Sequence, residues 1–128
     1  QWVMDNLGPD VPLHFSAFHP DYRMQDRGAT PPETLMRARR IARENGLHHV
    51  YTGNIDDKDG GSTYCHGCGV RLIGRDWYEV SDWNLTPDGK CNECGTACVG
   101  VFDAKPGRWG RRRQPIRLRD YARQMPAA

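Results

Sequence analysis

Two pairs of cysteines with matched spacing constrain the fold of this chain more than any other feature of its sequence. Cys65 and Cys68 form the first pair, Cys91 and Cys94 form the second, and a glycine directly follows each pair. Two residues between paired cysteines let both thiolates of a tight turn face one ion, and four thiolates make the closed tetrahedral shell that suits structural Zn²⁺. The 22 residues between the pairs slightly exceed the usual span of about 15 to 20, which a hairpin accommodates. The sequence therefore predicts a four-cysteine zinc site.

Other chemistry for these cysteines stays open at the level of sequence. A disulfide framework is disfavoured because the chain has five cysteines and no apolar targeting stretch. A single iron or an iron–sulfur cluster could use the same four thiolates, since soft sulfur ligands do not select a metal by spacing. Cys98, the fifth thiol, could replace a ligand or act in redox chemistry, but a small apolar packing residue is the favoured interpretation.

Charge is distributed unevenly along the chain. The net charge is +2, yet residues 104–128 carry eight Lys or Arg and one acid. The remainder holds ten basic and fifteen acidic residues, so a basic tail follows an acidic body. The tail arginines with Trp109 are typical of a nucleic-acid contact, but acidic neighbours within the chain would neutralise the same charges. No apolar run is long enough to cross a membrane, and we predict a cytoplasmic protein.

Residues 1–56 are predicted to form the last part of a larger α/β fold. Gly8 closes a short opening helix, and a helix end at this point indicates a piece of a longer protein. A strand is expected near 11–18 and another over 47–52, which makes one parallel βαβ crossover. Parallel strands are normally buried on both faces, which a lone unit cannot achieve.

The helix between these strands has clear start and stop signals. Thr30-Pro31-Pro32-Glu33 predicts a start at which the threonine hydroxyl accepts an orphan amide, and Asn45-Gly46 predicts the end. The arginines of the helix are expected to form a solvated face. Apolar residues recur at helical spacing, namely Leu35, Ala38, Ile41 and Ala42.

Residues 57–103 are predicted to form a small zinc-ribbon-like β module. Short strands are expected at 70–73 and 77–80, after a polar hinge at 56–61 and before a turn at 86–90. A unit this small needs metal coordination to contribute folding energy. Residues expected to supply its core are Trp77, Tyr78, Trp83, Leu85 and Phe102. Residues 104–128 form a basic C-terminal tail with too few apolar side chains for a core of its own.

Several segments together resemble one protein family, the radical S-adenosylmethionine protein of the AmmeMemoRadiSam system, which is similar to pyruvate formate-lyase activating enzymes. The resemblance spans residues 1–118. The segments that carry it are Pro9 to Met24, Thr30-Pro31, Ala38-Arg39, Val50 to Asn54, Thr63 to Gly69, Asp76-Trp77-Tyr78 and Trp109 to Leu118. It implies an α/β fragment: the terminal βαβ unit of a partial (β/α)₆ radical SAM barrel, followed by the zinc-ribbon-like module and the basic tail.

The resemblance also implies a chemistry for the parent enzyme. Members of the family cleave S-adenosylmethionine at a [4Fe–4S] cluster held by a C-x₃-C-x₂-C loop, as oxidoreductase-type activating enzymes do. This chain has no such loop, so we expect no radical chemistry from it alone. Its partners would be the N-terminal remainder of the barrel and a protein substrate.

Site residues follow from the same resemblance. The segment Ala17-Phe18-His19 looks like the Pro-Tyr-His turn that approaches the cofactor in activating enzymes, so His19 is the expected S-adenosylmethionine contact. His14 and Ser16 are further candidates, because side chains near strand C-termini form the sites of such folds. The alternative function is a non-catalytic zinc-ribbon module that binds nucleic acid through its basic tail.

Overall fold

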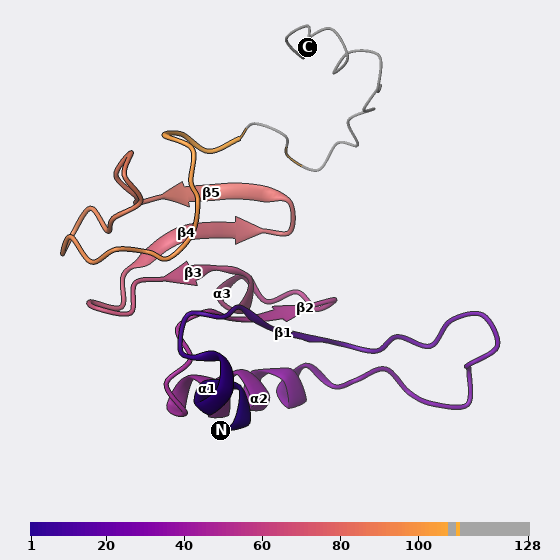
Figure 1. The fold of residues 1–128 in the computed structure, drawn as a ribbon. Coiled ribbons are helices and arrows are strands. Elements are labelled where there is room, and N and C mark those ends of the chain that lie inside the picture. Colours follow the sequence, from indigo (N-terminus) through magenta and orange to yellow (C-terminus); the bar gives the residue numbers. More distant parts are fainter. Residues whose placement is uncertain (108–109, 111–128) are drawn as a thin grey trace, which may run out of the picture.

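The chain forms a small α/β unit followed by a three-stranded antiparallel sheet (Figure 1). The computed structural model describes residues 1–107 and 110. The tail contact predicted at Trp109 and at the arginines of residues 108–119 lies outside the described residues.

The first unit contains α1 (Trp2–Leu7), β1 (Leu13–Ser16), α2 (Pro32–Glu44) and β2 (Val50–Gly53). The two strands are parallel, and their register runs from Leu13 opposite Val50 to Ser16 opposite Gly53. The predicted βαβ crossover is therefore confirmed. Both strands are shorter than the sequence indicated.

The ends of the helices follow the predicted signals, with one correction. Gly8, at φ 85°, ends α1, and its amide donates to the carbonyl oxygen of Met4 at 3.1 Å. At the start of α2 the predicted threonine cap is wrong, since Pro31 is the N-cap and no side chain caps the helix. Thr30 instead accepts a hydrogen bond from the Phe18 amide at 3.0 Å, which closes the base of the β1–α2 loop.

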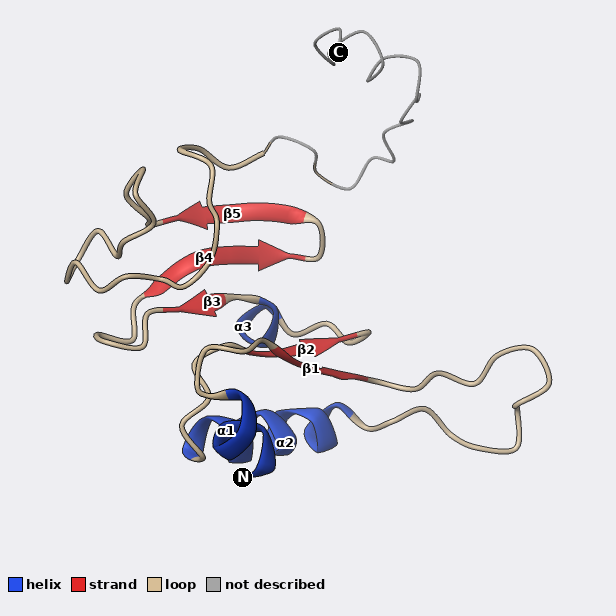
Figure 2. Cartoon of the chain, in the orientation of Figure 1, coloured by secondary structure: helices blue, strands red, loops and turns tan. Residues whose placement is uncertain are grey.

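α2 covers one face of the parallel pair (Figure 2). Leu13 and Phe15 point toward the helix and pack on a core cluster of Ala42, Leu47 and Val50. Ile41 is exposed, so the apolar stripe of α2 is narrower than its sequence spacing indicated. Because side chains alternate across a strand, the opposite face carries a different set. Those residues are His14, Ser16, Tyr51 and Gly53.

The second unit contains α3 (Lys58–Gly61), β3 (Thr63–Tyr64), β4 (Arg71–Asp76) and β5 (Glu79–Trp83), with sheet order β3-β4-β5. The predicted hinge at 56–61 is wrong, because Asp57 caps α3 by accepting from the Gly60 amide at 2.8 Å. The same carboxylate accepts from the Thr52 hydroxyl at 2.9 Å, which ties α3 to β2.

The hairpin of β4 and β5 corrects a second expectation. Asp76 pairs with Glu79, so Trp77 and Tyr78 form a two-residue turn and not a strand. Their rings are 56% and 77% exposed, and neither belongs to the core. The core predicted from Trp83, Leu85 and Phe102 is confirmed: these residues pack with Leu72 and Ile73 around the buried cysteines.

Polar and aromatic contacts join the two units. The Tyr51 hydroxyl lies 2.9 Å from the Thr63 hydroxyl. Arg39 donates to the carbonyl oxygens of Val50 and Asp59 at 3.0 and 3.2 Å, so this helix arginine is a structural tether and not part of a solvated face. No helix in the described part of the chain is long and apolar enough to span a membrane.

Candidate metal centre and neighbouring cavity

The two cysteine pairs fold into loops with the same backbone geometry. In the first, the amide of Gly69 donates to the carbonyl oxygen of Cys65 at 2.9 Å; in the second, Gly95 donates to Cys91 at 2.9 Å. The glycines have φ of 78° and 76°, the left-handed region that favours glycine. A glycine after each pair is therefore a requirement of the turn.

The loops bring four sulfur atoms together. Cys65 Sγ lies 3.5 Å from Cys94 Sγ, Cys68 Sγ lies 3.7 Å from Cys91 Sγ, and all four lie within 4.8 Å of one another. Tetrahedral coordination with Zn–S bonds of about 2.3 Å places sulfurs about 3.8 Å apart. The donor set and its spacing thus fit one tetrahedral metal ion, and the four sulfurs fill its coordination shell.

The pKa values of two of the four thiols are shifted in opposite directions. The hydroxyl and then the amide of Thr96 lower the pKa of Cys94 to about 6. The amide of Val70 lowers the pKa of Cys68, but hydrogen bonds with the other three sulfurs and desolvation outweigh it and raise that pKa to about 12. The thiolate form is thus favoured at Cys94 and the neutral thiol at Cys68. A divalent cation removes this difference by binding all four as thiolates.

Cys98 lies in the core beside the metal loops and outside the group of four. It is 8% exposed and packs with Leu72, Leu85 and Cys91. Burial raises the pKa of its thiol, so the neutral form is favoured. The interpretation of Cys98 as an apolar packing residue is confirmed.

The predicted cofactor residues lie on β1 and in the loop that follows it. His14 stacks on Tyr51 with ring centroids 4.9 Å apart, and Ser16 lies opposite Gly53 on the same face. A Cβ at Gly53 would lie 3.2 Å from Ser16 Oγ, so glycine allows this close approach. His19 Nε2 lies 2.7 Å from the carbonyl oxygen of Asn54, just past β2. Their role as cofactor contacts stays a prediction.

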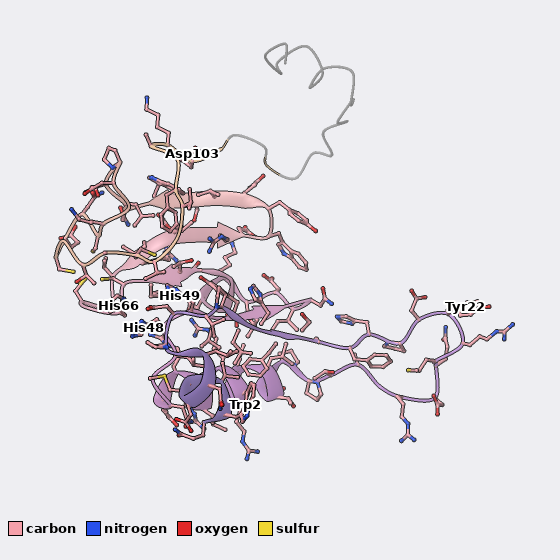
Figure 3. All side chains as sticks on the ribbon, viewed as in Figure 1. Trp2, Tyr22, His48, His49, His66 and Asp103 are labelled. Carbon is pink, nitrogen blue, oxygen red and sulfur yellow. The ribbon has the colours of Figure 1, made fainter. Side chains whose placement is uncertain are left out.

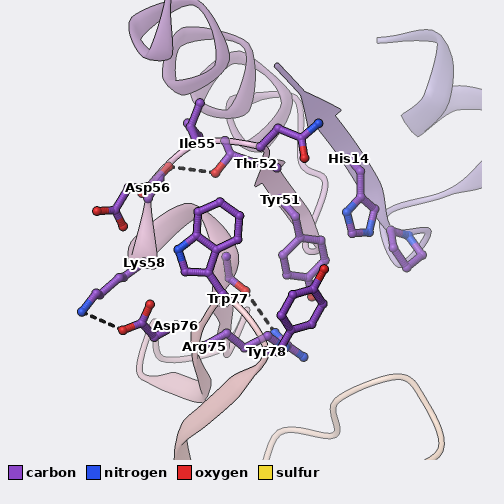
Figure 4. A pocket seen from close by; sticks show the side chains of 15 residues that line it. His14, Tyr51, Thr52, Ile55, Asp56, Lys58, Arg75, Asp76, Trp77 and Tyr78 are labelled. Carbon is purple, nitrogen blue, oxygen red and sulfur yellow. Dashed lines mark hydrogen bonds and ion pairs between the residues drawn. The ribbon is translucent and has the colours of Figure 1, made fainter. Parts of the chain in front are cut away.

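A cavity of about 580 Å³ lies between this strand face and the tip of the β4–β5 hairpin (Figure 4). Of the three cofactor candidates only His14 lines it. Four lining residues that matter here were not identified from sequence as site residues, namely Tyr51, Arg75, Trp77 and Tyr78. The sequence did offer one signal for the hairpin tip, two aromatic residues between acidic residues at 76 and 79. The high strand propensity of these aromatic residues instead favoured a strand.

The fold and the site define a small α/β protein with one parallel and one antiparallel sheet and a four-cysteine site able to bind a metal ion. The chain is similar to an uncharacterized protein of Methanocaldococcus jannaschii, with 47% identity over 95 residues. The match covers 73% of this chain and 28% of the relative, so the chain spans under a third of the relative's length. No protein-family model matches the chain, and no solved structure matches it.

Proposed function

We propose that this chain is the C-terminal portion of a radical S-adenosylmethionine enzyme and carries a structural zinc module. Residues 1–56 would complete a partial barrel, and residues 57–103 would form the module. The family is inferred from the resemblance of the sequence motifs. The observation that best supports it is the division of the parallel pair into an apolar face under α2 and a polar face with His14 and Ser16.

A polar inner face is what a barrel enzyme requires of its strands near their C-terminal ends, where ligands bind. Parallel strands normally have a packed layer on each face. Within the described part of the chain, the polar face meets the tip of the β4–β5 hairpin across a cavity instead. The N-terminal remainder of the barrel would supply that layer and the C-x₃-C-x₂-C cluster loop, which this sequence lacks.

The chain's own residues would then position the cofactor. His19 is joined to Asn54 at 2.7 Å, so the loop after β1 is fixed to the end of β2. The imidazole of His19 would then contact S-adenosylmethionine at the strand ends. The bound [4Fe–4S] cluster would supply the electron for reductive cleavage of that cofactor, and a protein is the proposed substrate.

Zinc is the proposed ion of the four-cysteine site. Its preference for four thiolates in a closed tetrahedron matches the spacing of the sulfurs. A closed shell leaves no position for water or substrate, so the ion would stabilise the module and take no part in catalysis. Iron bound by the same thiolates is the competing assignment.

The test uses the full-length protein encoded at this locus, with its cluster reconstituted anaerobically. We expect reductive formation of 5′-deoxyadenosine, and we expect His19→Ala to weaken S-adenosylmethionine binding about tenfold in calorimetry, the loss of one good polar contact. Gln25→Ala, in the same exposed loop, is the matched control and should bind normally. Unchanged affinity in His19→Ala excludes the cofactor role, and a protein without a cluster rejects the proposal.

The alternative, nucleic-acid binding through the basic tail, is supported by eight Lys or Arg among residues 104–128. A filter-binding assay at several salt concentrations separates the two functions. Tight binding to DNA or RNA that weakens steeply with salt would favour the alternative, because phosphate contacts release counterions.

A further inference from the structure

The cavity beside the strand ends has aromatic walls from two separate elements. Tyr51 comes from β2, and Trp77 and Tyr78 come from the β4–β5 turn (Figure 4). The ring of Tyr51 is already engaged, since His14 stacks on it and Arg75 lies 5.8 Å from the ring centroid. Trp77 and Tyr78 are exposed, so their ring faces are available to a ligand.

Trp77 adopts a backbone conformation that its side chain does not favour. Its φ is 55°, in the left-handed region that a two-residue turn usually fills with Gly or Asn. A bulky residue there is a strained outlier, and such outliers gather at functional sites. An indole held in this position, without contributing to the core, indicates a role for the ring itself.

The charges around the cavity decide which ligand fits. Lining acids are Asp56, Asp57 and Asp76, and lining bases are Lys58 and Arg75, so the walls carry a net charge of −1 with His14 neutral. Lys58 is paired with Asp76 at 3.0 Å. Arg75 donates to the Gly61 carbonyl oxygen and the Thr63 hydroxyl at 3.2 and 2.7 Å.

One carboxylate at the cavity remains without a partner. Asp56 makes no hydrogen bond or ion pair within the described part of the chain, while Asp57 is engaged by the Gly60 amide and the Thr52 hydroxyl. A free carboxylate beside exposed aromatic faces attracts a positive group, through charge and through the negative face of the rings. The same net charge disfavours an anion.

We propose that this cavity binds an organic cation, an alkylammonium or guanidinium group, against Trp77 and Tyr78 with Asp56 as its counter-ion. The two aromatic rings and the carboxylate of this site all belong to this chain, and the site needs no bound S-adenosylmethionine. Within the proposed enzyme it would give the zinc module a second role, the recognition of a basic group on the substrate.

The experiment is an NMR titration of the full-length protein with zinc bound, observing the indole N–H of Trp77, which is assigned by its absence in Trp77→Gly. The probes are N-acetyl-lysine methylamide and its neutral analogue N-acetyl-norleucine methylamide. We expect a saturable shift with the lysine probe and affinity about tenfold weaker for the neutral one, the scale of a cation–π contact and an ion pair together. Asp56→Asn should remove most of this difference.

n-Butylammonium distinguishes the sources of the cation. Equal affinity for butylammonium and the lysine probe indicates a free amine, and tighter binding of the lysine probe indicates a polypeptide side chain. Either result supports the site. Equal affinity for the lysine and norleucine probes overturns it, as does a larger Trp77 shift with inorganic phosphate.

Trp77→Gly separates binding from folding. Glycine relieves the left-handed conformation, so this variant should keep or raise the melting temperature. It should lose the lysine probe in calorimetry, which needs no indole signal. Tyr22→Gly is the matched control, because Tyr22 is also exposed and has φ of 50° but lies in the β1–α2 loop, away from the cavity (Figure 3). It should change stability in the same direction and leave binding intact. Normal binding by Trp77→Gly would refute the proposal without touching the enzyme assignment.

Discussion

The imidazole of His66, inside the first metal loop, stacks on the imidazole of His48 at the end of the α/β unit, with centroids 4.1 Å apart and planes 6° apart. His48 Nδ1 lies 2.8 Å from a carboxylate oxygen of Asp10, which fixes the second ring. A residue of the cysteine loop thus contacts the unit that carries the strand-end site. The metal centre is thereby coupled mechanically to that unit.

We predict that His66→Ala keeps the metal but weakens the link between the units. The ring is not one of the four sulfur ligands, so one zinc per chain should remain in elemental analysis. Loss of the stack should cost about 0.5–1.5 kcal/mol in chemical unfolding, the usual range for an aromatic pair. Loss of the metal in this variant would show that the imidazole is a ligand.

Cysteine substitutions should separate ligands from packing residues. Cys65→Ser or Cys94→Ser should release the metal and unfold β3 to β5, because this small core depends on coordination. Cys98→Ala should retain the metal and lose about 1 kcal/mol of stability, since it removes one buried sulfur atom. Metal content and hydrogen exchange report both effects. Equal losses in all three variants would show that the ligand assignment is wrong.

The connection between β2 and α3 depends on the absence of a side chain at Gly60. A Cβ at this position would overlap the Thr52 hydroxyl and the Asp57 carboxylate. That carboxylate caps the helix and accepts a hydrogen bond from Thr52. We expect Gly60→Ala to destabilise the protein by about 1–3 kcal/mol, the cost of overpacking a tight site. Gly28→Ala is the control, because nothing lies within 4 Å of its added Cβ. Urea unfolding should show the loss of stability in Gly60→Ala and not in Gly28→Ala.

The turn after β5 gives a prediction about pH. Hydrogen bonds from Lys90 and Thr86 lower the pKa of Asp88 to about 2. A carboxyl group whose pKa is lowered by folding stabilises the native state above its unfolded pKa, and that stabilisation is lost as the pH falls through the folded value. The melting temperature should therefore be lower in Asp88→Asn than in the native chain, by the same amount throughout roughly pH 5–8. A difference that changes within this range would contradict the assignment.

Local patterns predicted much of this structure. The cysteine spacing identified the metal loops because each loop is closed by its own backbone hydrogen bonds. Gly8 and Asn45 marked helix ends correctly, and the parallel crossover followed from the order of the segments.

The errors have a common physical origin in contacts between distant segments. Thr30 was assigned to a helix cap, but its hydroxyl bonds to Phe18 across the loop. Trp77 and Tyr78 have high strand propensity, yet the register of the two flanking strands places them in a turn. The cavity draws on residues from β1, β2 and the hairpin, and no local pattern in the sequence brings these together.

In the described part of the chain β1 pairs only with β2, so its other edge presents backbone amides and carbonyls to the surroundings. Such an edge is a template on which a further strand can assemble. Prepared in isolation, this chain should therefore self-associate through the β1 edge as its concentration rises, and light scattering would detect the larger species.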